Sequence, residues 1–231
     1  MIAGIDTLNK LKKWALDLIF PEVCLGCQKK GDVLCENCVL SIRRAERETD
    51  TRIYACFDYR DPVIKRAIWN LKYYKRMHLA SKLGVLLHEA MIEEVSGMRM
   101  YASGQSILVT PVPLSKSRKK TRGYNQAERI ARSFCYIGNT DSKNTFELRG
   151  DIVTKVRDTS PQARIANRTK RLENIKGAFK INNESMVKGR TIIVIDDVTT
   201  TGGTLLELMK ILKNAGAKKV VISAPSKGEG I

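Results

Sequence analysis

The chain has 231 residues, of which 43% are hydrophobic and 28% charged, values that suit a globular α/β domain with a small appendage and exclude a largely disordered chain. Its 41 basic and 24 acidic residues give a formal net charge of +17, which predicts a polyanionic ligand or partner. No apolar run approaches the roughly 18 residues that a membrane-spanning helix needs, so we expect no membrane insertion.

The start of the chain, up to Pro21, has the apolar spacing of a short amphipathic helix. Lys10, Lys12 and Lys13 interrupt any apolar core of an export signal, so we expect a cytoplasmic protein. A helix that packs on the body of the protein is favoured over one that lies on a membrane. The apolar positions are Leu8, Leu11, Trp14, Ala15, Leu18 and Ile19.

Four cysteines follow as two Cys-x-x-Cys pairs that are separated by seven residues. Two such pairs can offer four thiolates to one tetrahedral zinc ion, and Gly26 and Gly31 permit the tight turns that bring the sulfurs together. Disulfides or a redox pair are the alternatives, and a reducing cytosol disfavours both. The pattern therefore predicts a structural zinc site made of Cys24, Cys27, Cys35 and Cys38.

Beyond this module, strand patterns alternate with helical ones, which is typical of an α/β domain with an open, mostly parallel sheet and helices on both faces. We expect residues 1–50 to form the N-terminal helix and zinc module, and residues 51–231 to form the α/β domain. Apolar periodicity predicts one long helix from Asp61 to Met91, with a break near His78 as the alternative. The other expected elements are strands at 107–112, 152–156, 191–195 and 219–223 and helices at 125–136, 164–173 and 203–214.

Basic residues concentrate in three segments. Residues 52–82 hold eight lysines and arginines against two acids, residues 111–135 seven against one, and residues 155–180 eight against two. Ordinary solvated surface is the alternative, but this clustering favours the binding of phosphate groups. Because ligands of open α/β sheets bind at the carboxyl ends of the strands, we expect the second and third segments to border such a site.

The expected strand at 191–195 runs into two acids, Asp196 and Asp197, and then into a threonine- and glycine-rich loop that opens a helix. Backbone N–H groups at a helix start form an anion site, and threonine hydroxyls add donors. Adjacent carboxylates can accept hydrogen bonds from a diol, so the stretch predicts a pocket for a phosphorylated sugar. The alternative is a hydroxyl-rich turn with capping acids. The Gly-Lys-Ser/Thr ending of a nucleotide triphosphatase loop is missing.

This stretch resembles the motif with which type I phosphoribosyltransferases bind 5-phosphoribosyl-1-pyrophosphate (PRPP). The resemblance implies a type I phosphoribosyltransferase-like fold, in which Asp196 and Asp197 hold the ribose hydroxyls. Thr200 stands where members that act on 6-oxopurines have an Asp, which disfavours hypoxanthine and guanine as acceptors. The residues implied in binding the 5′-phosphate of PRPP are Thr199, Thr200, Thr201, Gly202, Gly203 and Thr204.

A second stretch, residues 111–126, reads Pro-Val-Pro-Leu, a basic loop and then Arg-Gly-Tyr-Asn-Gln. It resembles the ComF family of competence-associated phosphoribosyltransferase-like proteins, as do the four-cysteine module, Leu71-Lys72-Tyr73 and Gly177-Ala178-Phe179. The resemblance implies a pyrophosphate loop with Val112, Pro113 and Arg122, and a flexible loop over residues 155–174. Cations suited to the departing pyrophosphate are Lys155, Arg157, Arg164 and Arg168, and Mg²⁺ is expected with PRPP.

The resemblance predicts an enzyme that transfers the phosphoribosyl group of PRPP to an unidentified nitrogen acceptor, and a link to DNA uptake in natural transformation. The alternative is a non-catalytic PRPP sensor that binds single-stranded DNA on the PRPP face, with Tyr124 as a stacking surface. Proteins of the competence machinery are expected partners in either case. Glutamine-dependent amidophosphoribosyl transfer is disfavoured because no glutaminase part with an N-terminal cysteine is present.

Overall fold

The computed structural model describes residues 21–46, 53–102, 104–140, 145–159 and 173–228. The chain divides into two compact units, Met1–Ile42 and Arg43–Ile231. The domain boundary expected at residue 50 falls within residues 47–52, outside the described residues, and therefore stays a prediction. The helix expected before Pro21 and most of the helix expected at 164–173 also lie outside them.

The first unit is a small, irregular module built around the cysteines. Val23 and Lys30 form an isolated antiparallel bridge, and the helix α2 (Glu36–Ser41) follows with Cys35 at its start. Leu34 is fully buried and Val33 and Val39 nearly so. So few apolar side chains form a minimal core, which is why a module of this size gains much from a metal ion.

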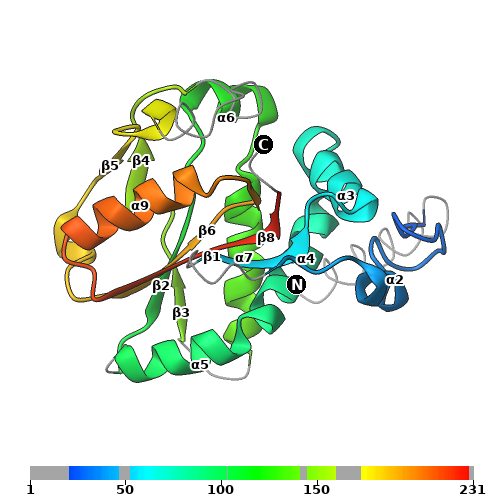
Figure 1. The fold of residues 1–231 in the computed structure, drawn as a ribbon, viewed down its shortest axis with the longest axis horizontal. Helices are drawn as coiled ribbons and strands as arrows, with labels where there is room; N and C mark the ends of the chain where they lie inside the picture. Colours follow the sequence, from blue (N-terminus) through cyan, green and yellow to red (C-terminus); the bar gives the residue numbers. More distant parts are fainter. Residues whose placement is uncertain (1–20, 47–52, 103, 141–144, 160–172, 229–231) are drawn as a thin grey trace, which may run out of the picture. The chain divides into compact units, whose positions relative to one another are not determined.

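The second unit is built on a sheet of six strands, all of them parallel, in the order β3-β2-β6-β8-β1 with β7 also paired to β8 (Figure 1). The mostly parallel sheet predicted from the sequence is confirmed. Every residue of β2 and β6 is buried, as is typical of strands that have helices on both faces. The strands are β1 (Ile53–Asp58), β2 (Ile107–Pro111), β3 (Phe146–Leu148), β6 (Thr191–Ile195), β7 (Val198–Thr199) and β8 (Lys219–Lys227).

Helices cover both faces of this sheet, as Figure 1 shows. The helix α9 (Gly203–Asn214) packs with Ile192 and Val194 in one hydrophobic cluster, while α4 (Met77–Ala90) and α7 (Gln126–Gly138) lie against the other face. Because side chains alternate along a strand, Ile193 and Ile195 face the side opposite to α9. The three-layer arrangement follows from strands that are apolar at every position.

The segment 61–91 forms two helices where one long helix was the first expectation. The helix α3 (Pro62–Tyr73) begins at Asp61, whose Oδ1 accepts hydrogen bonds from the backbone N–H groups of Val63 at 2.9 Å and Ile64 at 3.4 Å. It ends before a bend in which Lys75 has a φ of 54°, so the break lies just ahead of His78. The helices α5 (Ile92–Tyr101) and α6 (Lys116–Arg122) were not predicted.

The strand expected at 152–156 exists but not in the predicted place. It is β4 (Val153–Lys155), which pairs antiparallel with β5 (Phe179–Ile181) in a separate two-stranded sheet, followed by the 3₁₀ turn η2 (Glu184–Met186). The prediction that it belongs to the parallel sheet is wrong. Local β propensity does not specify a partner strand, and here the nearest partner is the strand at the other end of residues 156–178.

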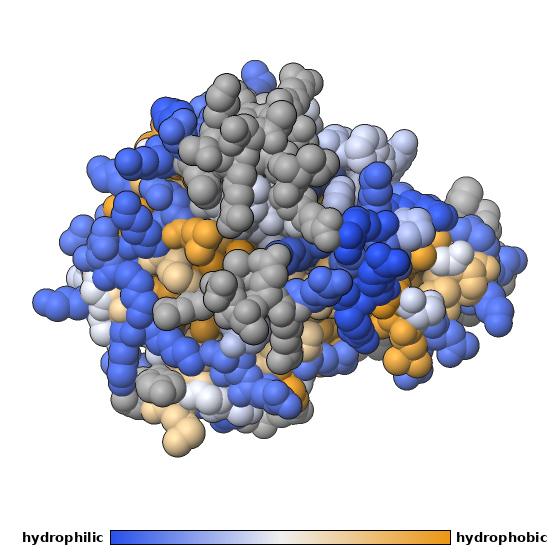
Figure 2. All heavy atoms as spheres, in the orientation of Figure 1, coloured by the Kyte–Doolittle hydropathy of each residue, from blue (hydrophilic) through white to orange (hydrophobic). Residues whose placement is uncertain are grey.

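The molecular surface is largely hydrophilic on the face seen in Figure 2, and hydrophobic side chains show there in separate patches. None of the helices in the described ranges has the length and apolar character that crossing a membrane requires. The large apolar or aromatic side chains that are exposed are Leu40, Trp69, Tyr73, Tyr74, Ile92, Met100, Tyr136, Val156 and Leu206.

The close packing of α4 on α7 depends on Gly84. A Cβ atom at this position would lie 2.6 Å from both the Ile130 carbonyl oxygen and the Ser133 Cβ. We therefore expect Gly84→Ala to force the helices apart and to lower the free energy of unfolding by about 1–3 kcal/mol in urea denaturation. Gly97→Ala is the matched control, because Gly97 lies in α5 with nothing within 4 Å of its would-be Cβ. An equal loss in both variants would contradict this packing argument.

Candidate functional site

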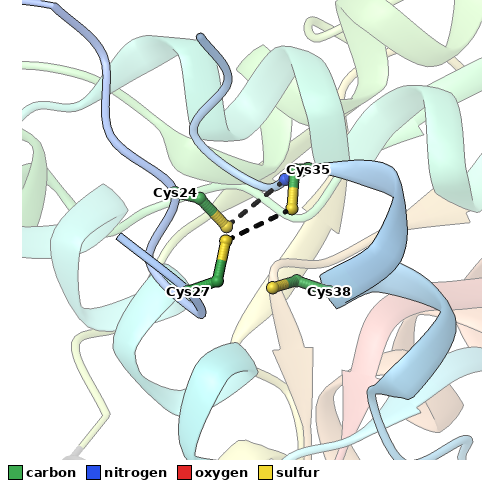
Figure 3. A group of neighbouring side chains, drawn as sticks. All are labelled: Cys24, Cys27, Cys35 and Cys38. Atoms are coloured by element: carbon green, nitrogen blue, oxygen red, sulfur yellow. Dashed lines mark hydrogen bonds between the residues drawn. The ribbon is translucent and has the colours of Figure 1, made fainter. Parts of the chain in front are cut away.

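The four predicted cysteine ligands come together in the first unit, and Figure 3 shows their sulfur atoms grouped around one centre. All four sulfurs lie within 4.8 Å of one another, and the Cys27 and Cys35 sulfurs are 3.6 Å apart. Four thiolates around one zinc ion, at Zn–S distances of about 2.3 Å, stand about 3.8 Å apart. The cluster therefore has the spacing of a closed tetrahedral metal site.

The backbone of this module prepares the cluster. The N–H groups of Gly26 and Cys35 each donate to the Cys24 sulfur at 3.4 Å. Burial alone would raise the pKa of the Cys24 thiol, but backbone hydrogen bonds from Cys35, Cys27 and Gly26 lower that pKa to about 6. A Cβ at Gly26 would lie 2.6 Å from the Cys38 sulfur, so only glycine fits in this turn.

The second candidate site lies at the carboxyl ends of β2 and β6. From β2 the chain crosses by α7 to β3, and from β6 it crosses by α9 to β8 on the opposite face of the sheet. The two connections leave these adjacent strands in opposite directions. In open α/β sheets such a reversal marks the crevice in which ligands bind, and we use the word crevice for this strand-end region. The Val112 N–H donates to the Ile195 carbonyl at 2.8 Å, so residues 112–113 start beside the acid pair.

The acid pair at this crevice differs between its two members. Asp196 is half-buried, and its Oδ1 accepts a hydrogen bond from the Asp197 N–H at 2.8 Å. Burial, together with the neighbouring Asp197 carboxylate, raises the pKa of Asp196 to about 7, against the opposing effect of Lys72 and Lys155. Asp197 is nearly buried and forms an ion pair through its Oδ1 with the Lys72 Nζ at 3.2 Å.

The loop after these acids ends in a helix start that no side chain caps. Gly202, at the N-cap of α9, has a φ of 73°, which favours glycine, and a Cβ there would lie 2.4 Å from the Ile53 Cδ1. The first N–H groups of α9 therefore lack a side-chain acceptor from this residue. The Thr201 hydroxyl is buried with no hydrogen-bond partner among the described residues. The N–H groups at a helix start can form an anion site.

Lys155 reaches this site from β4. Its Nζ donates to the Thr159 hydroxyl at 2.8 Å and lies 5.5 Å from the centroid of the Phe179 ring. Burial, reinforced by the charge of Arg118, lowers the pKa of Lys155 to about 8, and the charge of Asp196 acts in the opposite direction. The small antiparallel sheet thus brings one of the predicted cations close to the acids.

The other predicted cations have different surroundings. The Arg157 guanidinium donates to the carbonyls of Asn174 and Lys176, each at 3.0 Å, and so connects the two ends of the segment that encloses residues 160–172. Arg122 donates to the Gln126 Oε1 at 3.1 Å and lies 5.8 Å from the Tyr73 ring centroid. Arg164 and Arg168 lie outside the described residues.

Comparisons with known proteins agree with this geometry. The family described as "Phosphoribosyl transferase domain" matches residues 120–226. "DNA utilization protein YhgH" of Escherichia coli K12 is 26% identical over 209 residues, which cover 87% of this chain and 86% of that protein. "Competence protein F" of Haemophilus influenzae is 30% identical over 115 residues, 49% of this chain and 47% of that protein. These matches support the resemblance to the ComF family that the sequence motifs indicate.

A solved structure titled "Analysis of an invariant aspartic acid in HPRTs-glutamic acid mutant" is 10% identical to this chain. The match covers 70% of this chain and 77% of that chain, with a TM-score of 0.32. The α/β fold with a mostly parallel sheet, covered by helices and accompanied by a four-cysteine cluster, is shown by the structure together with the matched domain.

Two residues of this site were not predicted from the sequence. Lys72 was noted only as part of the Leu71-Lys72-Tyr73 motif, although it lies on α3 and forms an ion pair with Asp197. Asp158, whose pKa is lowered by hydrogen bonds from Ser115 and Ser117, connects the β4 side to the start of α6. Long-range pairing of charges gives no local sequence signal. The suggested stacking role of Tyr124 is wrong, because its ring is only 8% exposed and its hydroxyl donates to the Leu71 carbonyl.

The raised pKa of Asp196 predicts a pH dependence of stability. A carboxyl whose pKa rises from 3.8 to about 7 on folding contributes stability that is fully present below its unfolded pKa and is lost as the pH rises through its folded pKa. In metal-free buffer, Asp196→Asn should therefore raise the melting temperature relative to the unmodified chain more at about pH 8 than at about pH 5.

Asp151→Asn is the control with the opposite sign, since Arg149 lowers the pKa of Asp151. Removal of the Asp151 carboxylate should therefore lower the melting temperature at pH values above the pKa of that group in the unfolded chain. A difference between Asp196→Asn and the unmodified chain that stays constant from acid to alkaline pH would contradict the burial of a costly charge at residue 196.

Proposed function

We propose that this protein, which resembles the ComF family, binds PRPP with Mg²⁺ at the carboxyl ends of β2 and β6 and transfers its phosphoribosyl group to a nitrogen acceptor. The observation that carries the proposal is the uncapped start of α9, with the Thr201 hydroxyl that has no hydrogen-bond partner among the described residues, directly after the pair of Asp196 and Asp197. Donors for a phosphate and acceptors for a diol then lie in one crevice. A phosphorylated ribose presents both groups.

In the proposed complex the chain's own groups divide the work. The residues 199–204 donate hydrogen bonds to the 5′-phosphate, and Asp196 and Asp197 accept from the ribose hydroxyls. Lys72, which pairs with Asp197, orients that carboxylate. The acid pair also supplies the hard oxygen ligands that Mg²⁺ prefers, and when bound the ion neutralises charge on the pyrophosphate.

The reaction breaks the bond from the anomeric carbon to the pyrophosphate oxygen, whose electron pair leaves with pyrophosphate. The acceptor nitrogen forms the new bond to that carbon and loses its proton to solvent. Negative charge builds on the leaving group, so a nearby cation lowers the barrier. Lys155, whose pKa is influenced by the charge of Asp196, would supply this cation, and residues 112–122 would form the other wall. Arg157 would act indirectly, through its hydrogen bonds to the carbonyls of Asn174 and Lys176.

We also propose that the four cysteines hold a structural zinc ion, and that the protein acts in the cytoplasm, where reduced thiols persist. The names of two similar proteins, "DNA utilization protein YhgH" and "Competence protein F", support a role in the handling of DNA that has been taken up. The basic segments around the site favour the same role, because they suit a polyanion. The partners would then be PRPP, single-stranded DNA and proteins of the competence machinery.

The zinc proposal is tested by metal analysis. Purified protein should contain a single zinc ion per chain, and replacement of Cys35 and Cys38 by Ser should remove it and lower the melting temperature of the module, because a site with two ligands left binds the ion far more weakly. Cys135→Ala is the matched control, since Cys135 is buried in α7, outside the cluster. Full zinc content in the double variant would refute the site.

The PRPP proposal is tested by thermal shift. PRPP with Mg²⁺ should raise the melting temperature by mass action, by the equivalent of about 2.7 kcal/mol at a hundredfold excess over Kd. Replacement of Asp196 and Asp197 by Asn should abolish most of this rise, because an amide donates where acceptors are needed. The exposed pair Asp151→Asn with Glu184→Gln makes the same change in charge away from the crevice and should keep it.

A transferase and a PRPP sensor are distinguished by an assay that measures the release of pyrophosphate from PRPP in the presence of purines, pyrimidines or simple amines. Release that depends on one acceptor supports the transferase. A thermal shift without release in any arm supports a PRPP sensor. The absence of any shift in the unmodified protein would refute the binding site itself.

A further inference from the structure

The outer face of α3 presents aromatic rings to solvent. Trp69 is 53% exposed, Tyr73 55% and Tyr74 68%, and the Trp69 and Tyr73 ring centroids lie 4.5 Å apart with the planes tilted by 47°. The opposite face of the same helix is fully buried at Ile64, Ile68 and Leu71. Large aromatic side chains are usually buried, so three exposed rings on one short segment indicate a binding surface.

The same face is positively charged. Lys65 lies one helical turn before Trp69, on the same side as Tyr73, and Lys75 follows Tyr74. Both lysines are exposed, and neither forms an ion pair with an acid among the residues that the structure describes. The nearby acids are already engaged, because Asp58 binds Arg60 and Asp61 caps the start of α3.

Exposed aromatic faces beside free cations match the chemistry of an unpaired nucleic acid strand. Its bases stack on aromatic rings and its phosphates pair with lysine and arginine. A duplex hides its bases from such contacts. A membrane surface would require an apolar face, whereas Lys65 and Lys75 flank the three rings here.

We infer that the outer face of α3, comprising Lys65, Trp69, Tyr73, Tyr74 and Lys75, is a binding surface for single-stranded DNA. The choice of DNA rests on the role in DNA handling proposed above. The surface lies on α3 and not on the strand-end loops, where Tyr124 is buried and cannot stack. DNA and PRPP can then bind at the same time, whereas DNA bound on the PRPP face would compete with PRPP.

The surface is also connected to the strand-end site through one helix. Lys72 lies on α3 between the exposed Trp69 and Tyr73, yet its Nζ reaches the Asp197 carboxylate at 3.2 Å. Tyr73 in turn has the Arg122 guanidinium 5.8 Å from its ring centroid. Because Tyr73 contacts Arg122, Trp69 and Tyr74 are the positions to change.

The experiment measures fluorescence anisotropy of a labelled single-stranded oligothymidylate with the full chain. Replacement of Trp69 and Tyr74 by Ala should weaken binding by at least about tenfold, because each stacked base contributes about 1–3 kcal/mol. Tyr136→Ala is the matched control, since Tyr136 is 75% exposed on α7 and should leave the affinity unchanged. The PRPP-induced thermal shift should be the same in all three proteins, so a failure of the PRPP proposal is seen separately.

A second pair of variants tests the charges without removing a ring. Replacement of Lys65 and Lys75 by Gln should lower the slope of log affinity against log salt by about 0.7 for each phosphate that a lysine no longer neutralises. Duplex DNA should bind more weakly than the single strand, and its affinity should be the same for the aromatic variant and the unmodified protein. Single-stranded RNA that binds more tightly than DNA would replace DNA as the occupant.

The inference is overturned if the unmodified protein does not bind the oligonucleotide, or if both the aromatic and the lysine variants bind it as tightly as the control. It is also overturned if saturating PRPP with Mg²⁺ displaces the DNA at constant ionic strength, because the strand-end loops would then be the DNA site. If the aromatic variant fails to fold, the salt slope of the lysine variants decides the question.

Discussion

The direct pairing of β2 with β6 is the constraint on which the rest of the structure depends. It places Val112 beside Ile195, so that the residues after both strands begin at one edge of the sheet. Because the chain leaves β2 by α7 and β6 by α9, on opposite faces, the loops diverge and leave a crevice. Acids, hydroxyls and cations from distant parts of the sequence can meet only there.

The charged side chains at this crevice compensate one another only in part. Asp197 is compensated by Lys72, but Asp196 stays beside it with a raised pKa, and Lys155 opposite has a lowered one. Two acids and two lysines that are largely withdrawn from water in this way are poorly solvated. A ligand with both diol and phosphate groups would offer hydrogen bonds to the acids and negative charge to the lysines. The separate antiparallel sheet carries Lys155 on β4 and would therefore form part of the proposed site.

The helix α3 illustrates how one element can serve two surfaces. Asp61 fixes its start and the apolar positions fix its buried face, which leaves Lys72 directed inward and the aromatic rings outward. A movement of this helix would therefore act on both surfaces together. The first unit is organised differently. It has no large core and is built around four cysteine side chains and the tight turn at Gly26.

The sequence by itself determined the local elements of this protein: the four-cysteine cluster, the strand before Asp196, the start of α9 at Gly202 and the mostly parallel sheet. These depend on spacing, periodicity and turn residues within a few positions. Only the tertiary structure decided that β4 pairs with β5 outside that sheet, that Lys72 meets Asp197, and that Tyr124 is buried while Trp69 is exposed. Partners that lie far apart in the sequence leave no periodic trace, because strand pairing, burial and ion pairing depend on which surfaces the fold brings together.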